Sequence, residues 1–404
     1  MDKNKACLTP PMGWNSYDYY NTSINEEEIK ENARILAAKL LPSGWDTLVV
    51  DIEWYSVKPS AKAPKYQYTP FGELAMDEYG RLIPDPERFP SSVGGKGFGP
   101  IADYVHSLGL KFGIHIMRGI PRAAAQLHLP IYGSDMTCDD VADPANICFW
   151  NPDMYGTRPE EPGAQAYYDS IFKLYAEWGV DFIKCDDICR EDQPSAHEEI
   201  RMLHEAIEKN GRPMVLSLSP GPAKLTEAWW YEQHANMWRI TDDMWDKWEL
   251  LLAMFERCEV WQRHVGNGNW PDCDMLPFGM LGKGFGGNSW KTNLTQNEQI
   301  TLMTLWCIFR SPLMLGASLT EMDPWTLKLL TDRTYIDMNQ YGDRPTQLER
   351  NEDGALWIST DTRNGGTFVA AFNFTEETVT RRLNVLGATK EVVIPAHGAV
   401  HYHI

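Results

Sequence analysis

The chain has 404 residues, 43% of them hydrophobic, and its formal net charge at pH 7 is −19. This length exceeds that of an ordinary single core and predicts one large domain followed by a small one. The acidic balance excludes nucleic acid as an expected partner, because phosphate binding needs clustered Lys and Arg.

Strand and helix signals alternate along the first three quarters of the chain. Continuous apolar runs, typical of strands buried on both faces, predict strands at 12–16, 48–52, 111–116, 182–184, 214–218, 237–240 and 312–315. A less regular region around Trp270, Asp272 and Asp274 would supply a further strand between the last two. Helical periodicity predicts helices at 29–40, 101–108, 165–178, 197–209, 245–258, 296–309 and 324–331. Asn25 and Glu28 have the spacing of a capping box for the first helix.

This alternation predicts parallel strands joined by helical crossovers. Eight such units in about 330 residues favour a closed (β/α)8 TIM barrel with loop insertions. The alternative is an open doubly wound sheet, which is disfavoured because no Gly-rich phosphate loop follows an early strand.

The pattern changes near residue 335. Residues 355–360, 367–374 and 391–404 are β-rich runs separated by turn residues, which predicts a small C-terminal antiparallel β-sandwich. We therefore expect a catalytic barrel over residues 1–334 and a β-sandwich domain over 335–404.

Polar residues collect where the barrel strands end, on the face that carries the active site in this fold. In chain order they are Asp51, Glu53, His115, Lys184, Asp186, Ser219, Arg239 and Asp243. Each has a structural alternative: His115 fits a satisfied core histidine, and Arg239 fits a partner that neutralises a carboxylate. Together they indicate a site, because burying so many ionisable groups for structure alone would be costly.

Two of these acids fit the carboxylate pair of a glycosidase. Lys184 lies two residues before Asp186 on the same side of the strand, so it would hold the pKa of Asp186 low. Asp243 would need to hold its proton, which the nearby Asp242 and Asp246 favour and Arg239 opposes. A carboxyl separation of about 5–5.5 Å would favour retention of configuration, and a wider one inversion.

Several segments carry a family resemblance. They are 9–16 (TPPMGWNS), 80–90 (GRLIPDPERFP), 108–114 (LGLKFGI), 178–184 (WGVDFIK), 238–239, 270–276 (WPDCDML), 312–314 and 336–340. The chain resembles glycoside hydrolase family 27, the α-galactosidases and α-N-acetylgalactosaminidases. The resemblance implies a (β/α)8 barrel, a C-terminal β domain, and hydrolysis by double displacement with retained configuration.

The resemblance also implies roles. Asp186 would be the nucleophile and Asp243, not Asp242, the acid/base. Trp14 would stack on the sugar, and Lys184 and Arg239 would hydrogen-bond its hydroxyls. The remaining expected substrate-binding residues are Asp51, Glu53, His115, Ser219 and Asp274.

Some positions depart from the family pattern. Where the family has Asp-Asp-Cys-Trp after the second strand, this chain has Asp51-Ile52-Glu53-Trp54. One acid that clamps the C4 and C6 side of galactose is therefore lost, and whether Glu53 replaces it is left open. His115 replaces a tyrosine, and Asp187 follows the nucleophile where Asn or Gly is usual. Ser219 and the small residues after it are similar to the version that tolerates a 2-acetamido group.

The leading hypothesis is therefore an exo-acting, retaining α-galactosidase for terminal α-D-galactosides. The alternatives are an α-N-acetylgalactosaminidase and a β-L-arabinopyranosidase, whose sugar has galactose's ring hydroxyls without the C6 hydroxymethyl group. More distant alternatives are a Schiff-base aldolase that uses Lys184 and a non-catalytic sugar-binding protein.

The expected partner is a carbohydrate substrate, with no nucleic acid, membrane, cofactor or metal; homo-oligomerisation is left open. The eight cysteines fit reduced thiols better than a disulfide framework, although Cys138 and Cys148 could close a loop. The N-terminus lacks the apolar core of a signal peptide, so we expect a cytoplasmic protein, without excluding secretion. Two insertions on the active-site face carry aromatic residues, for which we expect one of three roles: lining the pocket or a subsite, packing within the insertions, or forming a subunit interface. These residues are Tyr66, Tyr68, Tyr132, Trp150 and Tyr155.

Overall fold

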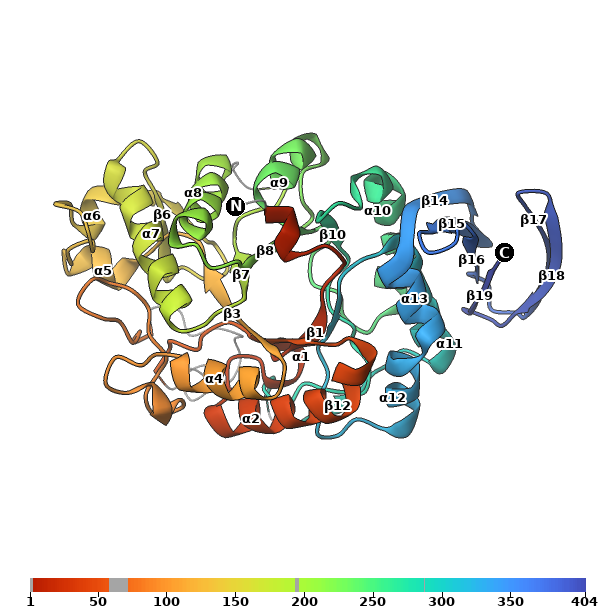
Figure 1. Ribbon diagram of the computed structural model, residues 1–404, viewed down its shortest axis with the longest axis horizontal. Helices are drawn as coiled ribbons and strands as arrows, with labels where there is room; N and C mark the ends of the chain where they lie inside the picture. Colours follow the sequence, from red (N-terminus) through yellow and green to blue (C-terminus); the bar gives the residue numbers. More distant parts are fainter. Residues whose placement is uncertain (1–2, 58–71, 193–195, 287) are drawn as a thin grey trace.

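The computed structural model describes residues 3–57, 72–192, 196–286 and 288–404. Eight parallel strands form its central sheet in the order β10-β9-β8-β7-β3-β2-β1-β13 (Figure 1). They are β1 (Met12–Asn15), β2 (Thr47–Val50), β3 (Lys111–Met117), β7 (Phe182–Asp186), β8 (Val215–Leu218), β9 (Met237–Arg239), β10 (Trp270–Asp272) and β13 (Leu313–Leu315). The expected eight-strand (β/α)8 architecture is confirmed.

The sheet curls until its two edge strands approach each other. The segment after β10 pairs with β13, because the N–H of Leu276 donates to the carbonyl of Met314 at 2.8 Å. The N–H of Gly316 in turn donates to the carbonyl of Leu276 at 3.2 Å. This pairing joins the edges, so the carboxyl ends of all eight strands share one face.

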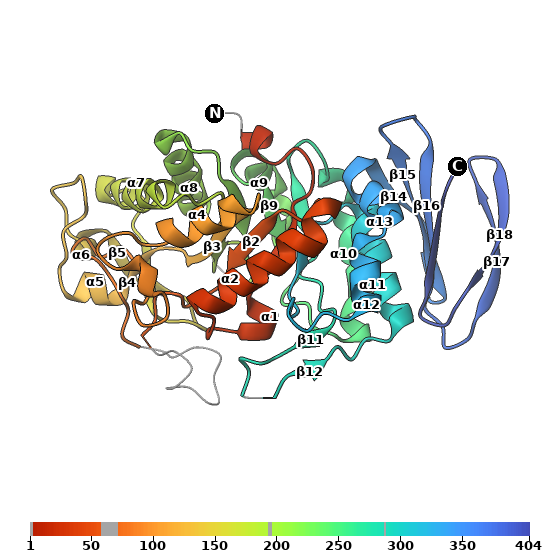
Figure 2. The same cartoon turned by 60° about the horizontal axis from the view of Figure 1, so that its bottom comes forward.

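Helices follow the strands and cover the outside of the sheet (Figures 1 and 2). They are α1 (Tyr17–Tyr20), α2 (Glu26–Ile35), α4 (Gly99–Ser107), α5 (Arg122–Gln126), α6 (Cys138–Val141), α7 (Pro162–Glu177), α8 (His197–Asn210), α9 (Ala228–His234), α10 (Trp248–Trp261), α11 (Gln296–Phe309), α12 (Pro324–Thr331) and α13 (Arg333–Tyr341). The expected capping box begins α2: Asn25 accepts the N–H of Glu28, and Glu28 accepts that of Asn25. α13 was not expected.

Two small sheets extend the loops on the carboxyl face of the barrel. The insertion after β3 forms β4 (Ile120–Pro121), β5 (Ala142–Ile147) and β6 (Met154–Thr157) in the order β4-β6-β5. A hairpin of β11 (Met280–Leu281) and β12 (Trp290–Lys291) follows β10. Neither was predicted, because these segments are short and lack regular alternation. Tyr66 and Tyr68 lie outside the described residues.

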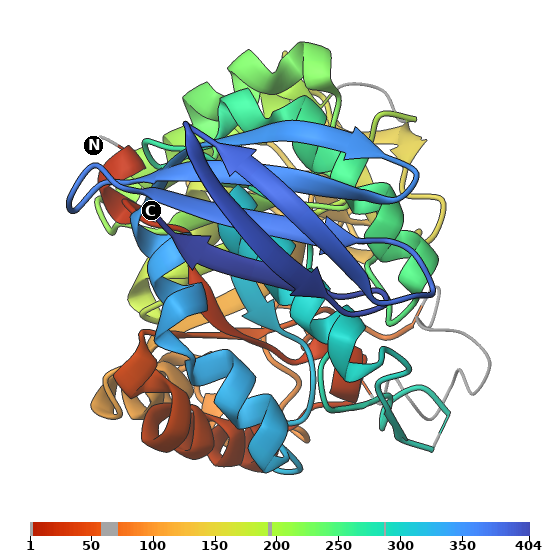
Figure 3. The same ribbon diagram turned by 90° about the vertical axis from the view of Figure 1, so that its right-hand side faces the viewer.

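Six antiparallel strands follow α13 and form two further sheets (Figure 3). One contains β14 (Gly342–Asn351), β15 (Gly354–Asp361), β16 (Thr367–Asn373) and β19 (Ala399–His403); the other contains β17 (Val379–Val385) and β18 (Ala388–Ile394). The expected division at residue 335 stays a prediction, and that position lies inside α13.

Alternation along β15 shows why the larger sheet is buried on both faces. Trp357 belongs to the barrel's core and packs against Phe309 of α11, with ring centroids 6.3 Å apart. Leu356, on the opposite face, joins Leu383 and Ile394 in a separate core between the two sheets. Successive side chains of β15 point to opposite faces of its sheet, so one face packs against α11 of the barrel and the other against the second C-terminal sheet.

All eight cysteines are buried and free. No helix in the described part of the chain is long and apolar enough to cross a bilayer.

Candidate functional site

The first half of the site is a cluster at the ends of β1, β2 and β7. The ammonium of Lys184 donates to Asp51 Oδ2 at 2.9 Å, and Asn15 Nδ2 donates to the same oxygen at 2.7 Å. Asp51 is 2% exposed. Burial alone would raise the pKa of Asp51, but the charge of Lys184 and the backbone N–H of Ile52 lower it below its usual range. Asp51 is therefore ionised and fixed in position.

Asp186 ends β7 beside this cluster. In the parallel ladder, His115 is in register with Lys184, and Met117 with Asp186. The Nε2 atom of His115 lies 3.0 Å from Asp186 Oδ2. Burial would raise the pKa of Asp186, but the hydrogen bond from His115 and the charge of Lys184 lower it overall. Asp186 thus presents an ionised carboxylate, as a nucleophile must.

The second half of the site is built around Arg239 at the end of β9. The guanidinium contacts Asp274 Oδ1 through Nη1 at 2.9 Å and Asp243 Oδ1 through Nη2 at 3.2 Å. Asp274 also accepts the backbone N–H of Met244 at 2.7 Å, which fixes the chain directly after Asp243. Arg239 therefore holds two carboxylates in a set geometry.

Asp243 has a different environment from Asp186. Its side chain is 46% exposed, so substrate can reach it. The surrounding protein nevertheless withdraws water from the carboxylate and raises its pKa, and the charge of Asp274 adds to this while Arg239 opposes it. A raised pKa suits a group that must carry a proton to a leaving oxygen.

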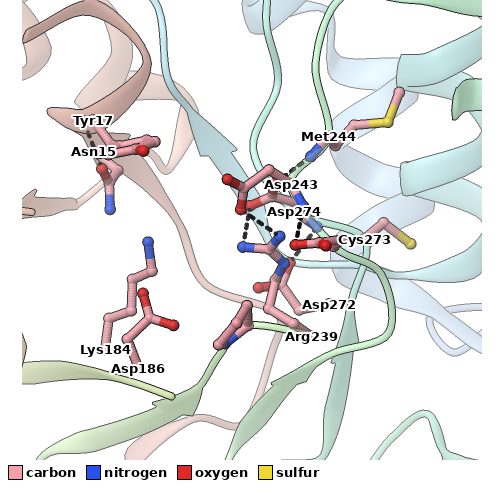
Figure 4. Close-up of polar contacts among 12 residues, drawn as sticks. Asn15, Tyr17, Lys184, Asp186, Arg239, Asp243, Met244, Asp272, Cys273 and Asp274 are labelled. Atoms are coloured by element: carbon pink, nitrogen blue, oxygen red, sulfur yellow. Dashed lines mark hydrogen bonds and ion pairs between the residues drawn. The ribbon is translucent and has the colours of Figure 1, made fainter. Parts of the chain in front are cut away.

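The two halves face each other across one space (Figure 4). Lys184 and Asp186 lie on one side of it, and Arg239, Asp243 and Asp274 on the other. The negative charge of Asp186 contributes to the raised pKa of Asp243, so the two carboxyls are electrostatically coupled. Opposite pKa shifts on two facing carboxyls are the arrangement expected of a nucleophile and an acid/base.

Lys184 is charged in this setting. Burial would lower its pKa, but Asp51 and Asp186 outweigh burial and raise it. A Schiff-base lysine needs a lowered pKa to be a free amine. The geometry therefore disfavours the aldolase alternative.

Two expected binding residues, Trp14 and Glu53, have other contacts. Trp14 is fully buried, and its indole N–H donates to the carbonyl of Ala317 at 2.8 Å. Glu53 is fully buried and has a positive φ of 68°, which turns it toward Ser56 and Asn151. The binding roles of Trp14 and Glu53 stay predictions.

Ser219 directly follows β8 and is buried. Its hydroxyl has no hydrogen-bond partner among the described residues. It lines a cavity of about 20 Å³ with Lys184, Arg239 and Asp272, a volume that suits about one water molecule. Its binding role also stays a prediction.

The two acids beside the catalytic candidates have separate functions in the fold. Asp187 has a φ of 60° and forms a 2.9 Å ion pair with Arg118, away from Asp186. That left-handed conformation explains why Asn or Gly suits this position. Asp242 is 58% exposed and accepts the backbone N–H of Asp243 at 3.0 Å.

Sequence reasoning missed four residues of the site. Asn15 orients Asp51, as described above, and Tyr17 lies with its ring 5.7 Å from the Lys184 ammonium. Asp18 is buried beside them with a raised pKa, caused by burial and by Asp274. Asp272 is in register with Arg239, and burial raises its pKa to about 6. The signal for Asn15 and Tyr17 was their place at the end of the first strand.

Within the described ranges, no group of three or more His, Cys, Asp or Glu side chains could hold a metal ion.

Comparisons with known proteins identify the family. A family model described as alpha galactosidase A matches residues 9–128 and 154–341. The family-27 β-L-arabinopyranosidase of Geobacillus stearothermophilus is 47% identical, with a TM-score of 0.94 over 100% of this chain and 98% of that one. A variant of that enzyme has been solved in complex with arabinose.

Curated relatives are more distant. Alpha-galactosidase 2 of Arabidopsis thaliana is 26% identical, covering 88% of this chain and 73% of its own length. Alpha-N-acetylgalactosaminidase of Gallus gallus is 28% identical, covering 84% and 72%. Since the family model spans most of the barrel, the chain belongs to the α-galactosidase family, glycoside hydrolase family 27, and is a glycosidase.

Proposed function

We propose that this protein is a retaining exo-glycosidase that releases terminal β-L-arabinopyranosyl groups. The observation that carries the proposal is Ile52, which takes the place of one acid of the family's C4 and C6 clamp. Ile52 is 2% exposed, and its backbone N–H donates to Asp51 Oδ1 at 2.9 Å. The apolar side chain of Ile52 cannot hydrogen-bond a C6 hydroxyl, as the acid that it replaces would, and it suits a sugar without one.

The glycone preference follows from desolvation. A galactoside would place its C6 hydroxyl against Ile52, and an unpaired buried hydroxyl is unfavourable. An arabinopyranoside has the same ring hydroxyls and no C6 group. The 47% identical relative acts on such a sugar, which supports the same assignment here.

The carboxylates divide the chemistry in two steps. Asp186 attacks the anomeric carbon while Asp243 gives its proton to the leaving oxygen. Asp243, now ionised, then takes a proton from water as that water displaces Asp186. Two inversions give net retention.

The other residues hold the sugar. Lys184, Asp51 and Arg239 present charged groups to the ring hydroxyls. We place the aromatic contact on Tyr17 rather than on Trp14, because Tyr17 lies 5.7 Å from the Lys184 ammonium and is 5% exposed, whereas Trp14 is fully buried.

A second candidate is α-galactosidase activity, the leading hypothesis from sequence. It is favoured by curated relatives at 26–28% identity that are named alpha-galactosidases or, in one case, a probable alpha-galactosidase. Because these relatives are distant, Ile52 and the 47% identical structure weigh more in the choice of glycone.

Initial rates on nitrophenyl β-L-arabinopyranoside, α-D-galactoside and N-acetyl-α-D-galactosaminide would test the proposal. We expect the highest kcat/KM on the arabinopyranoside, by about tenfold or more. A higher kcat/KM on either other substrate would overturn the glycone assignment. The absence of hydrolysis of all three by wild-type protein would support a non-catalytic sugar-binding protein.

A further inference from the structure

An exposed phenylalanine lies in the insertion after β3. Phe149 is 65% exposed, although its neighbours Cys148 and Asn151 are buried at 2% and 0%. All three belong to the turn between β5 and β6, in the insertion after β3. The turn is therefore anchored on both sides and holds one aromatic ring out toward solvent.

One face of this ring is covered by an arginine. The guanidinium carbon of Arg190 lies 5.4 Å from the Phe149 ring centroid. Arg190 follows β7, four residues after Asp186, and Phe149 lies in the insertion after β3. Since β3 and β7 are neighbouring strands, the arginine and the phenylalanine come from adjacent loops. Since most of Phe149 remains exposed, a ligand can reach the ring beside this contact.

Arg190 is held in place by acids. It forms a two-point ion pair with Asp192, at 2.9 Å from both Nε and Nη2, and a 3.3 Å contact with Asp242. Its side chain is 16% exposed. The next residue is fixed as well, because the N–H of Glu191 donates to the carbonyl of Pro222 at 2.8 Å. The arginine is thus a fixed support rather than a free surface cation.

This cluster is connected to the acid/base. Asp242 binds Arg190 through Oδ2 and accepts the backbone N–H of Asp243 through Oδ1 at 3.0 Å. The leaving group of a glycosidase departs beside the acid that protonates it. Arg190 and Asp242 therefore connect the exposed ring of Phe149 to the residue that would protonate the leaving group.

We infer that Phe149, supported by Arg190, binds the leaving-group sugar by stacking against the C–H face of its pyranose ring. The inference rests on the proposed function and adds the class of aglycone: a second sugar rather than a small alcohol. Aromatic faces suit this contact because they offer a large apolar area at little conformational cost. The acidic groups around Arg190 disfavour an anionic aglycone.

The test compares two substrates with the same glycone. One is a disaccharide with a second pyranose as leaving group, and the other is the glycosyl fluoride, whose leaving group is too small to reach the ring. For Phe149→Ala we expect kcat/KM on the disaccharide to fall about five- to tenfold. On the fluoride it should stay within about twofold, because the glycone site is untouched.

Two further variants complete the design. Phe149→Trp should keep disaccharide activity, because it preserves an aromatic face. Tyr341→Ala is the matched control: Tyr341 is 38% exposed and lies under Arg363 at 4.6 Å, at the end of α13. Tyr341→Ala should leave kcat/KM unchanged on both substrates. An equal fall on both substrates for Phe149→Ala, or no fall on the disaccharide, would overturn the inference.

Failure of the inference is distinguishable from failure of the proposed function. If wild-type protein hydrolyses the glycosyl fluoride, the nucleophile and the glycone site are active whatever Phe149 does. If wild type hydrolyses neither substrate, the proposed function fails and the stacking role of Phe149 fails with it.

Discussion

Glu53 offers a quantitative test of the electrostatics beside the site. Its carboxyl is fully buried against Ser56 and Asn151. Burial raises its pKa from the ordinary 4.5 to about 7, and the charge of Asp153 adds to the shift. The folded protein therefore binds this proton more tightly than the unfolded chain does.

The raised pKa of Glu53 makes the folded protein less stable as the pH rises. Below pH 4.5, Glu53 is protonated in both states and the shift has no effect. Between pH 4.5 and 7 the unfolded chain ionises first, so the folded state loses stability. The full penalty is present above pH 7. A shift of about 2.5 pKa units corresponds to about 3 kcal/mol.

Glu53→Gln should remove this penalty. The amide can accept from Asn151 Nδ2 and donate to the Ser56 hydroxyl, as a protonated carboxyl would. We expect the variant's gain in unfolding free energy over wild type to be about 2–3 kcal/mol larger at about pH 8 than at about pH 5. Urea titrations of both proteins at the two pH values would measure it.

The control for this experiment is Glu27→Gln, because Glu27 is on the surface with 84% of its side chain exposed. The unfolding free energy of Glu27→Gln should differ from that of wild type by the same small amount at both pH values. A gain in unfolding free energy of Glu53→Gln over wild type that is the same at both pH values, or smaller at the higher pH, would refute the argument.

Three further variants test the site itself. Lys184→Met should lower kcat/KM about 10²–10³-fold on an aryl glycoside, because Asp51 and Asp186 lose their shared cation; a near-wild-type rate would contradict this. Ile52→Asp should raise the ratio of galactosidase to arabinopyranosidase kcat/KM about tenfold or more, whereas Ile52→Val should not change it. Asp243→Asn should impair poor leaving groups by about 10²–10⁴-fold and activated aryl groups far less. Wild-type activity should fall as pH rises through the raised pKa of Asp243, and the variant should lose that alkaline limb. Equal losses on both leaving groups would argue against Asp243 as the acid.

The barrel could be predicted because its strands are buried on both faces. Leu48 to Val50 and Phe182 to Cys185 are nearly continuous apolar runs, which are typical of the strands of a parallel sheet. The polar residues at the end of the second run, Lys184 and Asp186, then stand out as functional. Because parallel strands end at one face of a barrel, the order of the strands also predicted that both halves of the site would meet there.

Side-chain direction was harder to predict. At the end of β1, Trp14 and Tyr17 are both large aromatics, and only the packing shows that the Trp14 indole is enclosed while Tyr17 lies beside Lys184. Glu53 follows a strand as Asp51 does, but its positive φ turns it into another network. Neither direction follows from residue type or spacing.

The insertion sheet was also beyond sequence patterns. Residues 142–147 (ADPANI) contain a proline and little apolar alternation, so nothing in them indicates a strand. Their structure comes from pairing with β6, which is a contact between segments separated by a turn. Phe149, which lies in that turn, was for this reason not singled out.

The central claim is that Asp186 and Asp243 act as nucleophile and acid/base on one sugar. Azide rescue tests it most directly, because azide replaces whichever carboxylate is missing and its product records the face of attack. With an activated aryl glycoside, Asp186→Gly plus azide should yield the glycosyl azide of inverted configuration, and Asp243→Gly plus azide the one of retained configuration. A glycosyl azide of retained configuration from Asp186→Gly, or substantial hydrolysis by that variant without azide, would contradict the account.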